Sequence, residues 1–215
     1  MKLYNYWRSS CSWRVRIALH YKGIAFEYVP VHLLKDGGEQ NADAYREKNP
    51  MAQVPTLEWQ EGGKNLRLGQ SLAIIEMLEE EHPTPPLLPQ DRYLRARARQ
   101  LAEVVNAGIQ PFQNTSVVKY VKNELHADEQ AFARRFIEKG LGAFQALVDE
   151  VGGRYSVGDA PTVADVCLVP QLYAARRVNV DLARFDRLLQ IEKNCAEQPA
   201  FQAAHPDRQI DAVPV

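Results

Sequence analysis

A short proline-rich segment divides the chain into two parts of different character. Residues 82–90 contain four prolines, which cannot continue a helix and which suit a stiff linker. The part before this segment shows short β-branched and aromatic runs between helical stretches, whereas the part after it shows almost only helical periodicity. We therefore predict a domain at 1–82, a linker at 83–90 and a second domain at 91–215.

The first domain is predicted to be α/β with a mixed sheet, in the order β-α-β-α-β-β-α. A helix between the first two strands leaves room for a crossover, so these strands should be parallel. Glu61 to Lys64 contains two glycines and is predicted to form a hairpin turn. Ser71 is expected to cap the last helix. The expected strands are 2–7, 24–31, 56–59 and 65–68, and the expected helices begin near 15, 42 and 72.

The second domain is predicted to be all-α. Thr162 and Asp165 have the spacing of a capping box, with Asp in place of Glu. Pro111 should bend or end the first helix of this domain, and the tail after Pro199 is expected to be irregular. The expected helices are 91–109, 127–151, 162–177 and 182–196.

Composition and charge exclude several classes of function. A formal net charge of -1 gives no bulk attraction to nucleic acid or to an anionic membrane. Three cysteines do not make a disulfide framework, which favours a reducing compartment. No apolar run approaches the ~18 residues that span a bilayer, and the N-terminus does not resemble a signal peptide. We expect a cytoplasmic protein without nucleic-acid or membrane partners.

Small polar residues join the first predicted strand to the first predicted helix. This junction, Ser9-Ser10-Cys11-Ser12, places hydroxyls and unpaired backbone N–H groups at a helix N-terminus, which favours an anion, including a thiolate. A run of capping serines without any ligand explains the same residues. Cys11 could itself be a reactive thiol, because a helix N-terminus lowers the pKa of a thiol. Position 14 is arginine, which argues against a dithiol mechanism but leaves a monothiol one open.

Taken together, these motifs resemble the zeta class of the glutathione transferases. The run from Ser9 to Arg16 is similar to the serine-cysteine signature of that class. Further matching segments extend over nearly the whole chain, at 36–38, 49–51, 53–57, 70–76, 110–114 and 167–171. The resemblance implies the glutathione transferase architecture, with a thioredoxin-like glutathione-binding domain followed by an all-helical substrate-binding domain. It also implies glutathione as the cofactor and a homodimer.

The resemblance assigns roles to many of these residues. Ser9 would contact the glutathione sulfur, with Ser10 and Cys11 assisting catalysis. A cis bond at Val54–Pro55 would expose the Val54 backbone to the ligand, although base rates favour trans. Gln70 and Ser71 would hold the γ-glutamyl end. The other predicted glutathione contacts are Ser12, Trp13, Arg14, Gln110, Asn114, Thr115 and Ser116.

His32 and Gln40 follow from position rather than from a motif. Both lie in or after the second predicted strand and could reach the glycyl carboxylate of the ligand. For His32 a plain surface histidine is the alternative.

A bound thiol could be ionised here without a general base. Lowering a thiol pKa of ~8.5 by ~2 units takes roughly 2.7 kcal/mol. One hydroxyl hydrogen bond to charged sulfur contributes ~1.5–3 kcal/mol, and a helix N-terminus adds ~0.3–1 kcal/mol. Together, these two contributions are sufficient to lower the thiol pKa by ~2 units.

The implied activity is a glutathione-dependent cis–trans isomerisation of a dicarboxylate enone by thiolate addition, rotation and elimination. The expected substrate is maleylacetoacetate, which gives fumarylacetoacetate in tyrosine and phenylalanine breakdown. Arg8, Arg176 and Arg177 are predicted to bind substrate carboxylates, for which the guanidinium fork is suited. Three alternatives stay open: a maleylpyruvate substrate, a transferase that conjugates or dehalogenates α-haloacids, and a non-catalytic binding module of the same fold.

Overall fold

The computed structural model describes residues 1–213, which form two compact units. Unit 1 comprises Met1–Pro85 together with the segment from Gln198 onward, and unit 2 comprises Pro86–Glu197. The division differs from the predicted limits at the C-terminal end, because the segment after Gln198 packs on α1 of the first unit. Residues 214 and 215 of the predicted second domain lie outside the described residues.

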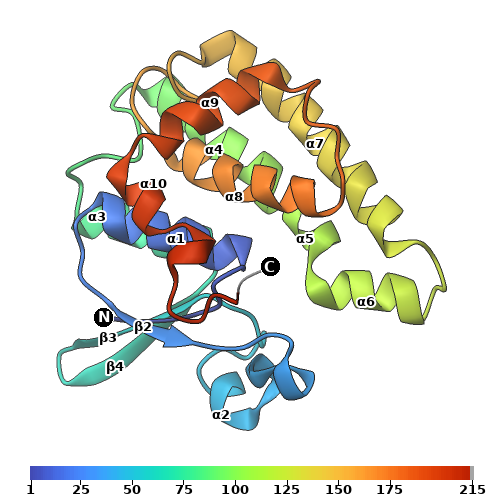
Figure 1. Ribbon diagram of the computed structural model, residues 1–215. Coiled ribbons are helices and arrows are strands. Elements are labelled where there is room, and N and C mark those ends of the chain that lie inside the picture. Colours follow the sequence, from blue (N-terminus) through green and yellow to red (C-terminus); the bar gives the residue numbers. More distant parts are fainter. Residues whose placement is uncertain (214–215) are drawn as a thin grey trace. The chain divides into compact units, whose positions relative to one another are not determined.

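Unit 1 is built on a mixed four-stranded sheet in the order β2-β1-β3-β4 (Figure 1). β1 pairs parallel with β2 and antiparallel with β3, and β3 pairs antiparallel with β4 across the predicted hairpin turn. The strands are β1 (Lys2–Asn5), β2 (Glu27–Pro30), β3 (Thr56–Glu61) and β4 (Lys64–Gly69). The predicted mixed sheet and its order of elements are confirmed.

Helices cover both faces of this sheet. Figure 1 shows α1 and α3 on one side of the strands and α2 on the other. α1 is buried from Ser12 to Leu19, because it packs against α3 and α10. The helices are α1 (Ser10–Tyr21), α2 (Asp43–Arg46), α3 (Ser71–Glu81) and α10 (Pro199–Ala203), with 3₁₀ turns at Lys35–Gly37, Glu39–Asn41 and Pro206–Arg208.

The expectation of an irregular tail after Pro199 is therefore wrong. α10 has only five residues, too few to show a helical period in the sequence. Its apolar residue Phe201 is buried in unit 1, and the carbonyl of its C-cap residue Ala204 accepts from a residue of α1 that is distant in the sequence.

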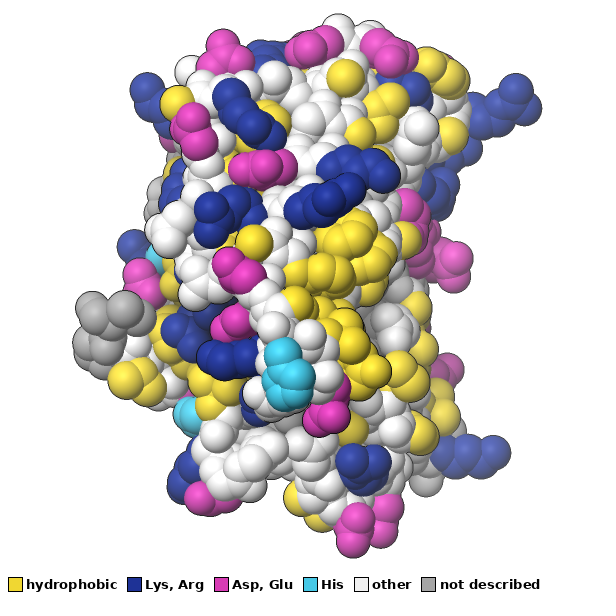
Figure 2. All heavy atoms as spheres, turned by 90° about the vertical axis from the view of Figure 1, so that its right-hand side faces the viewer, with side chains coloured by type: hydrophobic (Ala, Val, Ile, Leu, Met, Phe, Trp, Pro, Cys, Tyr) yellow, Lys and Arg dark blue, Asp and Glu magenta, His cyan; other side chains and the backbone are white. Residues whose placement is uncertain are grey.

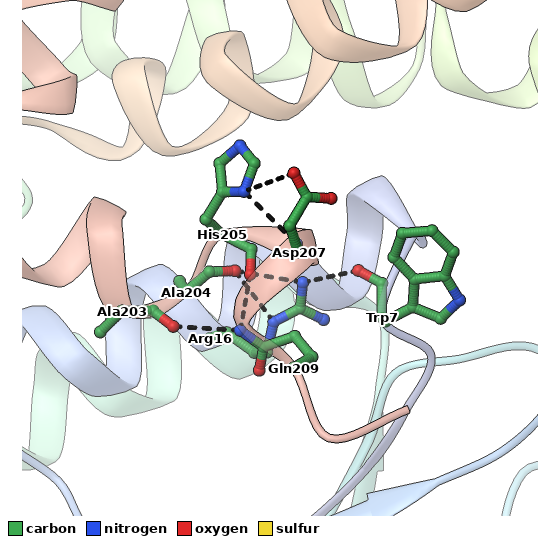
Figure 3. Close-up of polar contacts among 7 residues, drawn as sticks. All are labelled: Trp7, Arg16, Ala203, Ala204, His205, Asp207 and Gln209. Carbon is green, nitrogen blue, oxygen red and sulfur yellow. Dashed lines mark hydrogen bonds and ion pairs between the residues drawn. The ribbon is translucent and has the colours of Figure 1, made fainter. Parts of the chain in front are cut away.

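That residue is Arg16, which is fully buried and donates all five of its guanidinium N–H groups; Figure 3 draws the bonds to Trp7 and Ala204. Nη1 donates to Asn5 Oδ1 at 3.0 Å and to the Tyr6 carbonyl at 3.3 Å. Nη2 donates to the Trp7 carbonyl at 2.8 Å, and both Nη2 and Nε donate to the Ala204 carbonyl at 3.2 Å. Burial lowers the pKa of Arg16 to about 10, so the side chain is still charged at neutral pH. Arg16 thus joins the end of β1, α1 and the C-terminal segment.

Unit 2 is all helical, as predicted. α8 is its most buried helix, since every residue from Val163 to Leu172 is inside the unit, where α8 packs on α4 and α9. The predicted capping box is confirmed: Asp165 accepts from the Thr162 N–H at 2.7 Å and also from the Ser156 N–H at 2.8 Å. The helices are α4 (Arg92–Asn106), α5 (Gln110–Gln113), α6 (Thr115–Asn123), α7 (Glu129–Val151), α8 (Val163–Arg177) and α9 (Asp186–Ala196).

The surface carries a mixture of charges. Figure 2 shows Lys and Arg side chains interspersed with Asp and Glu on the face that it draws, in keeping with the net charge of -1. Within residues 1–213, no helix combines the length and the apolar character that crossing a membrane requires.

Replacing Arg16 should destabilise unit 1 strongly. An Arg16→Met substitution leaves the carbonyls of Tyr6, Trp7 and Ala204 without this donor, so we expect the free energy of unfolding to fall by about 3–5 kcal/mol. All three tryptophans lie in residues 1–85, so tryptophan fluorescence during urea unfolding reports on unit 1.

The matched control is Arg46→Met, which removes an exposed guanidinium from the same unit. It should change the free energy of unfolding by no more than about 0.5 kcal/mol. If the two variants were equally stable, the buried bonds of Arg16 would contribute nothing net.

Candidate functional site

The topology of unit 1 brings several predicted site residues to one edge of the sheet. β1, β2 and β4 run in the same direction and β3 runs in the opposite one. In the register, Tyr4 lies opposite Thr56, which lies opposite Gly69. The segments that follow β1, β2 and β4 and the one that precedes β3 therefore share an edge, where open α/β sheets bind their ligands. These segments contain Ser9, His32, Val54–Pro55 and Gln70–Ser71.

Ser9 is the N-cap of α1 and is fixed through three of its atoms. Its N–H donates to the Tyr6 carbonyl at 3.0 Å, and its carbonyl accepts from the Trp13 N–H at 2.9 Å. Its Oγ accepts from the Ser12 N–H at 3.2 Å. Because this bond uses an oxygen lone pair, the hydroxyl proton of Ser9 can still be donated to an anion.

The first turn of α1 offers further donors. The backbone N–H groups of Ser10 and Cys11 make no hydrogen bond within residues 1–213, and the turn contains no acidic residue. Both side chains are half-buried, and Cys11 is a free thiol. Uncompensated N–H groups at the positive end of a helix of this length favour a bound negative charge. The donor set fits an anionic sulfur or a carboxylate.

The next three predicted contacts are inside unit 1. Ser12 Oγ accepts from the Tyr6 N–H at 3.5 Å, and the Trp13 ring packs edge-on against His205. Arg14 Nη1 donates to Ser71 Oγ at 3.3 Å, which connects α1 to the first residue of α3. All three of Ser12, Trp13 and Arg14 are buried, so their contribution to a ligand site is to support the residues around them.

The loop that leads into β3 is held by a small polar network. The Val54–Pro55 bond is cis, as the resemblance implies. Tyr45 Oη and Asn49 Nδ2 donate to the Gln53 carbonyl at 2.7 and 2.8 Å, and both also bond to Thr56 Oγ1. Burial raises the pKa of Tyr45 to about 12, so its hydroxyl keeps the proton that it donates. The backbone at Val54 is therefore presented by a loop with a defined conformation.

The prediction that Ser71 caps α3 is wrong by one residue. α3 begins at Ser71, and the N-cap is Gln70, whose φ is +66°. β4 ends at Gly69, so a single residue has to turn the chain from strand to helix, which requires this left-handed conformation. Ser71 Oγ bonds to Arg14 and does not cap the helix.

His32 and Gln40 lie in the segment between β2 and α2. His32 Nδ1 accepts from the backbone N–H groups of Leu34 and Lys35, at 3.2 and 2.9 Å, which places the ring proton on Nε2. The amide of Gln40 lies against Gly38, and its Oε1 is buried without a hydrogen-bond partner among residues 1–213. Contact of either residue with a ligand stays a prediction.

The predicted ligand contacts of unit 2 lie at the starts of two short helices. Gln110 is the first residue of α5, and Thr115 is the first residue of α6. Asn114 caps α6, because its Oδ1 accepts from both the N–H and the hydroxyl of Ser116, at 3.1 and 2.9 Å. Capping accounts for Asn114 and Ser116 within unit 2, and their contact with a ligand stays a prediction.

The three predicted carboxylate ligands differ in their surroundings. The Arg8 guanidinium lies over the Trp7 ring, 5.2 Å from its centroid. Arg176 forms a bidentate pair with Glu192, at 2.7 and 2.5 Å, and this hydrogen bonding raises the pKa of Arg176. Arg177 is exposed at the C-terminal end of α8. Glu192 thus occupies the fork of Arg176, and contact of either Arg176 or Arg177 with a carboxylate stays a prediction.

Sequence reasoning missed two residues that support Ser9. Arg16 sits in an apolar stretch between Val15 and Ile17, and a charge in such a stretch is the one signal that could have marked it as buried. Asp211, whose Oδ2 accepts from the Trp7 N–H at 3.1 Å, has no local sequence signal.

Comparisons with known proteins agree with this architecture. Residues 3–86 match the family model "Glutathione S-transferase, N-terminal domain", and residues 111–203 match "Glutathione S-transferase, C-terminal domain". A maleylacetoacetate isomerase of Rattus norvegicus is 46% identical over 97% of this chain and 94% of its own.

Solved structures are similar over the same extent. A maleylacetoacetate isomerase from Anaeromyxobacter dehalogenans 2CP-1, with GSH bound in its active site, has a TM-score of 0.91 and 50% identity over 99% of this chain and 97% of its own. A maleylpyruvate isomerase, described as a bacterial zeta-class glutathione S-transferase, has a TM-score of 0.92 and 44% identity over 99% of this chain and 100% of its own.

Proposed function

Because the chain belongs to the glutathione S-transferase family, we propose that it is a glutathione-dependent cis–trans isomerase that converts maleylacetoacetate to fumarylacetoacetate. The observation that carries the chemistry is the Ser9 hydroxyl, whose oxygen accepts from the Ser12 N–H and which donates to no acceptor within residues 1–213. Relatives named as maleylacetoacetate isomerases, at 46–50% identity over nearly the whole chain, support the substrate.

Bound glutathione supplies a nucleophilic sulfur for attack on a conjugated double bond. Ser9 would donate its hydroxyl proton toward the sulfur position, and the first-turn N–H groups of Ser10 and Cys11 would stabilise negative charge there. The Val54 backbone and the start of α3 at Gln70–Ser71 lie at the same sheet edge and would hold the peptide part of the cofactor. No side chain has to act as a base in this arrangement.

Two arginines are proposed to bind the carboxylates of the substrate. Arg8 precedes Ser9 in unit 1, and its packing on the Trp7 ring restricts its rotamers. Arg177 is proposed for unit 2, because the resemblance aligns it with the substrate-binding arginine of the family. Both would also stabilise enolate charge that develops on the substrate.

Maleylpyruvate is the second candidate substrate. It is supported by the maleylpyruvate isomerase that superimposes on this chain with a TM-score of 0.92 and 44% identity. Both substrates present a cis double bond conjugated to a carbonyl group and a terminal carboxylate, so the Ser9 junction serves either.

Steady-state turnover distinguishes these substrates. We expect kcat/KM to be higher for maleylacetoacetate than for maleylpyruvate, and we expect both rates to fall to background when glutathione is omitted. A faster reaction with maleylpyruvate would reverse the assignment of substrate. Turnover that does not depend on glutathione would refute the mechanism altogether.

Replacing the serine that caps α1 tests its role directly. Ser9→Ala should lower kcat more than tenfold, because the hydroxyl is expected to supply over ~1.4 kcal/mol at the transition state. Ser9→Thr keeps both the cap and the hydroxyl and should retain most of the activity. The matched control is Ser10→Ala, for which we expect a smaller loss. A larger loss in Ser10→Ala than in Ser9→Ala would transfer the sulfur contact to Ser10.

We also propose a cytoplasmic homodimer. Membership of the glutathione S-transferase family supports the dimer, and three free cysteines suit a reducing compartment. Light scattering on the purified protein should give twice the chain mass of 24.4 kDa. A mass of one chain at micromolar concentration would refute the dimer.

A further inference from the structure

The turn between β1 and α1 is held at both backbone polar groups of one residue, Trp7. The Trp7 N–H donates to Asp211 Oδ2 at 3.1 Å, and the Trp7 carbonyl accepts from Arg16 Nη2 at 2.8 Å. Figure 3 shows the Arg16 guanidinium between the Trp7 carbonyl and the C-terminal segment at Ala204. The turn is thus held by the C-terminal segment, since Trp7 and Asp211 are 204 positions apart.

Asp211 is itself held in place. Its second carboxylate oxygen accepts from the Tyr28 hydroxyl of β2. The segment that carries Asp211 is folded back on itself, because Gln209 Nε2 donates to the carbonyls of Ala203 and His205, at 3.0 and 2.7 Å. The Ala212 N–H closes the next turn on the Gln209 carbonyl at 3.1 Å. Asp211 can therefore act as a fixed acceptor.

The contacts of Asp211 and Arg16 with the Trp7 backbone lie close to Ser9 in the chain. Only Arg8 lies between Trp7 and Ser9, and the Ser9 N–H donates to the Tyr6 carbonyl at 3.0 Å. The same carbonyl accepts from Arg16 Nη1 at 3.3 Å. A shift of the Trp7 peptide therefore changes where the Ser9 hydroxyl lies, and small displacements of a hydrogen-bond donor reduce its effect steeply.

We propose that Asp211 is a positioning residue for the Ser9 hydroxyl, acting through the Trp7 N–H. The proposal rests on the proposed function, since the hydroxyl is aligned for the sulfur of bound glutathione. Asp211 itself touches neither cofactor nor substrate. The C-terminal segment thereby helps to determine the pKa of the bound glutathione thiol.

The test is the pKa of the glutathione thiol in the complex, measured from the ultraviolet absorbance of the thiolate against pH. In Asp211→Ala we expect this pKa to rise by about one unit. At pH values below both the wild-type and the variant pKa, the thiolate fraction then falls about tenfold. kcat should therefore fall about tenfold at acidic pH and recover at alkaline pH. A purely structural loss would lower activity by the same factor at every pH. The pKa is a property of the folded complex, so partial unfolding of the variant does not change it.

Three further variants isolate the contact with Trp7. Tyr28→Phe removes one anchor of Asp211 but keeps its bond to the Trp7 N–H, so the thiol pKa should rise by clearly less than in Asp211→Ala. Asp211→Asn keeps an oxygen that can accept from Trp7 and should restore the wild-type thiol pKa. Asp207→Ala removes an exposed carboxylate from the same segment and should have no effect.

The outcomes separate this proposal from the proposed function. If wild-type protein ionises glutathione and Asp211→Ala does so with the same pKa, or if Tyr28→Phe raises the pKa equally, the positioning role is refuted. If wild-type protein leaves the thiol un-ionised, the proposed function fails. In that case, amide hydrogen exchange of the ligand-free protein tests the positioning role of Asp211. Asp211→Ala should speed exchange of the Trp7 and Ser9 amides about tenfold. Unchanged exchange rates would refute the positioning role.

Discussion

The five hydrogen bonds of the buried Arg16 are the interaction on which unit 1 depends most. A guanidinium can be taken out of water only if all of its donors find acceptors, and four of the five donated bonds here end on main-chain carbonyls. The nearby Asp211 and Tyr28 favour the charged form electrostatically, although burial outweighs them. Because carbonyls are the acceptors, the bonds constrain backbone positions rather than a partner side chain. The end of β1 and the C-terminal segment are thereby fixed relative to α1.

The sheet topology turns this local rigidity into a site. β3 is antiparallel to its two neighbours, so its beginning lies beside the ends of β1 and β4. Three features consequently lie at the same edge of the sheet: the N-cap Ser9, the backbone of Val54 before the cis-proline, and the start of α3 at Gln70. The cap also shows how one hydroxyl can do two tasks. Ser9 stabilises α1 with its oxygen, and its proton is left for a ligand.

Much of this arrangement could be predicted from patterns that act within a few residues. The hairpin at Glu61–Lys64 and the capping box of Thr162 and Asp165 depend on neighbouring positions only, and both are confirmed. The start of α3 was misplaced by one residue, because propensity favours a serine cap whereas the short connection from β4 imposes a left-handed Gln70. The cis bond at Val54–Pro55 could be expected only from the resemblance, since base rates point the other way.

The contacts that support Ser9 were beyond sequence reasoning for a different cause. Arg16 and Ala204 are 188 positions apart, and Trp7 and Asp211 are 204 apart. No periodicity or motif links residues at such separation. An arginine inside a buried helix and an aspartate in a short tail each have ordinary local explanations, and their partnership is visible only in three dimensions.

Inclusion of the segment from Gln198 in unit 1 has a consequence for synthesis on the ribosome. Translation delivers the sheet and its three helices early, but the acceptor at Ala204 and the carboxylate of Asp211 emerge only after all of unit 2 has been made. Until the segment from Gln198 has been synthesised, the Arg16 guanidinium lacks its acceptor at Ala204, and the Trp7 N–H lacks its acceptor at Asp211. Unit 1 therefore cannot complete its hydrogen bonding before that segment is made. The sheet of unit 1 is therefore synthesised well before one of the segments that complete its hydrogen bonding.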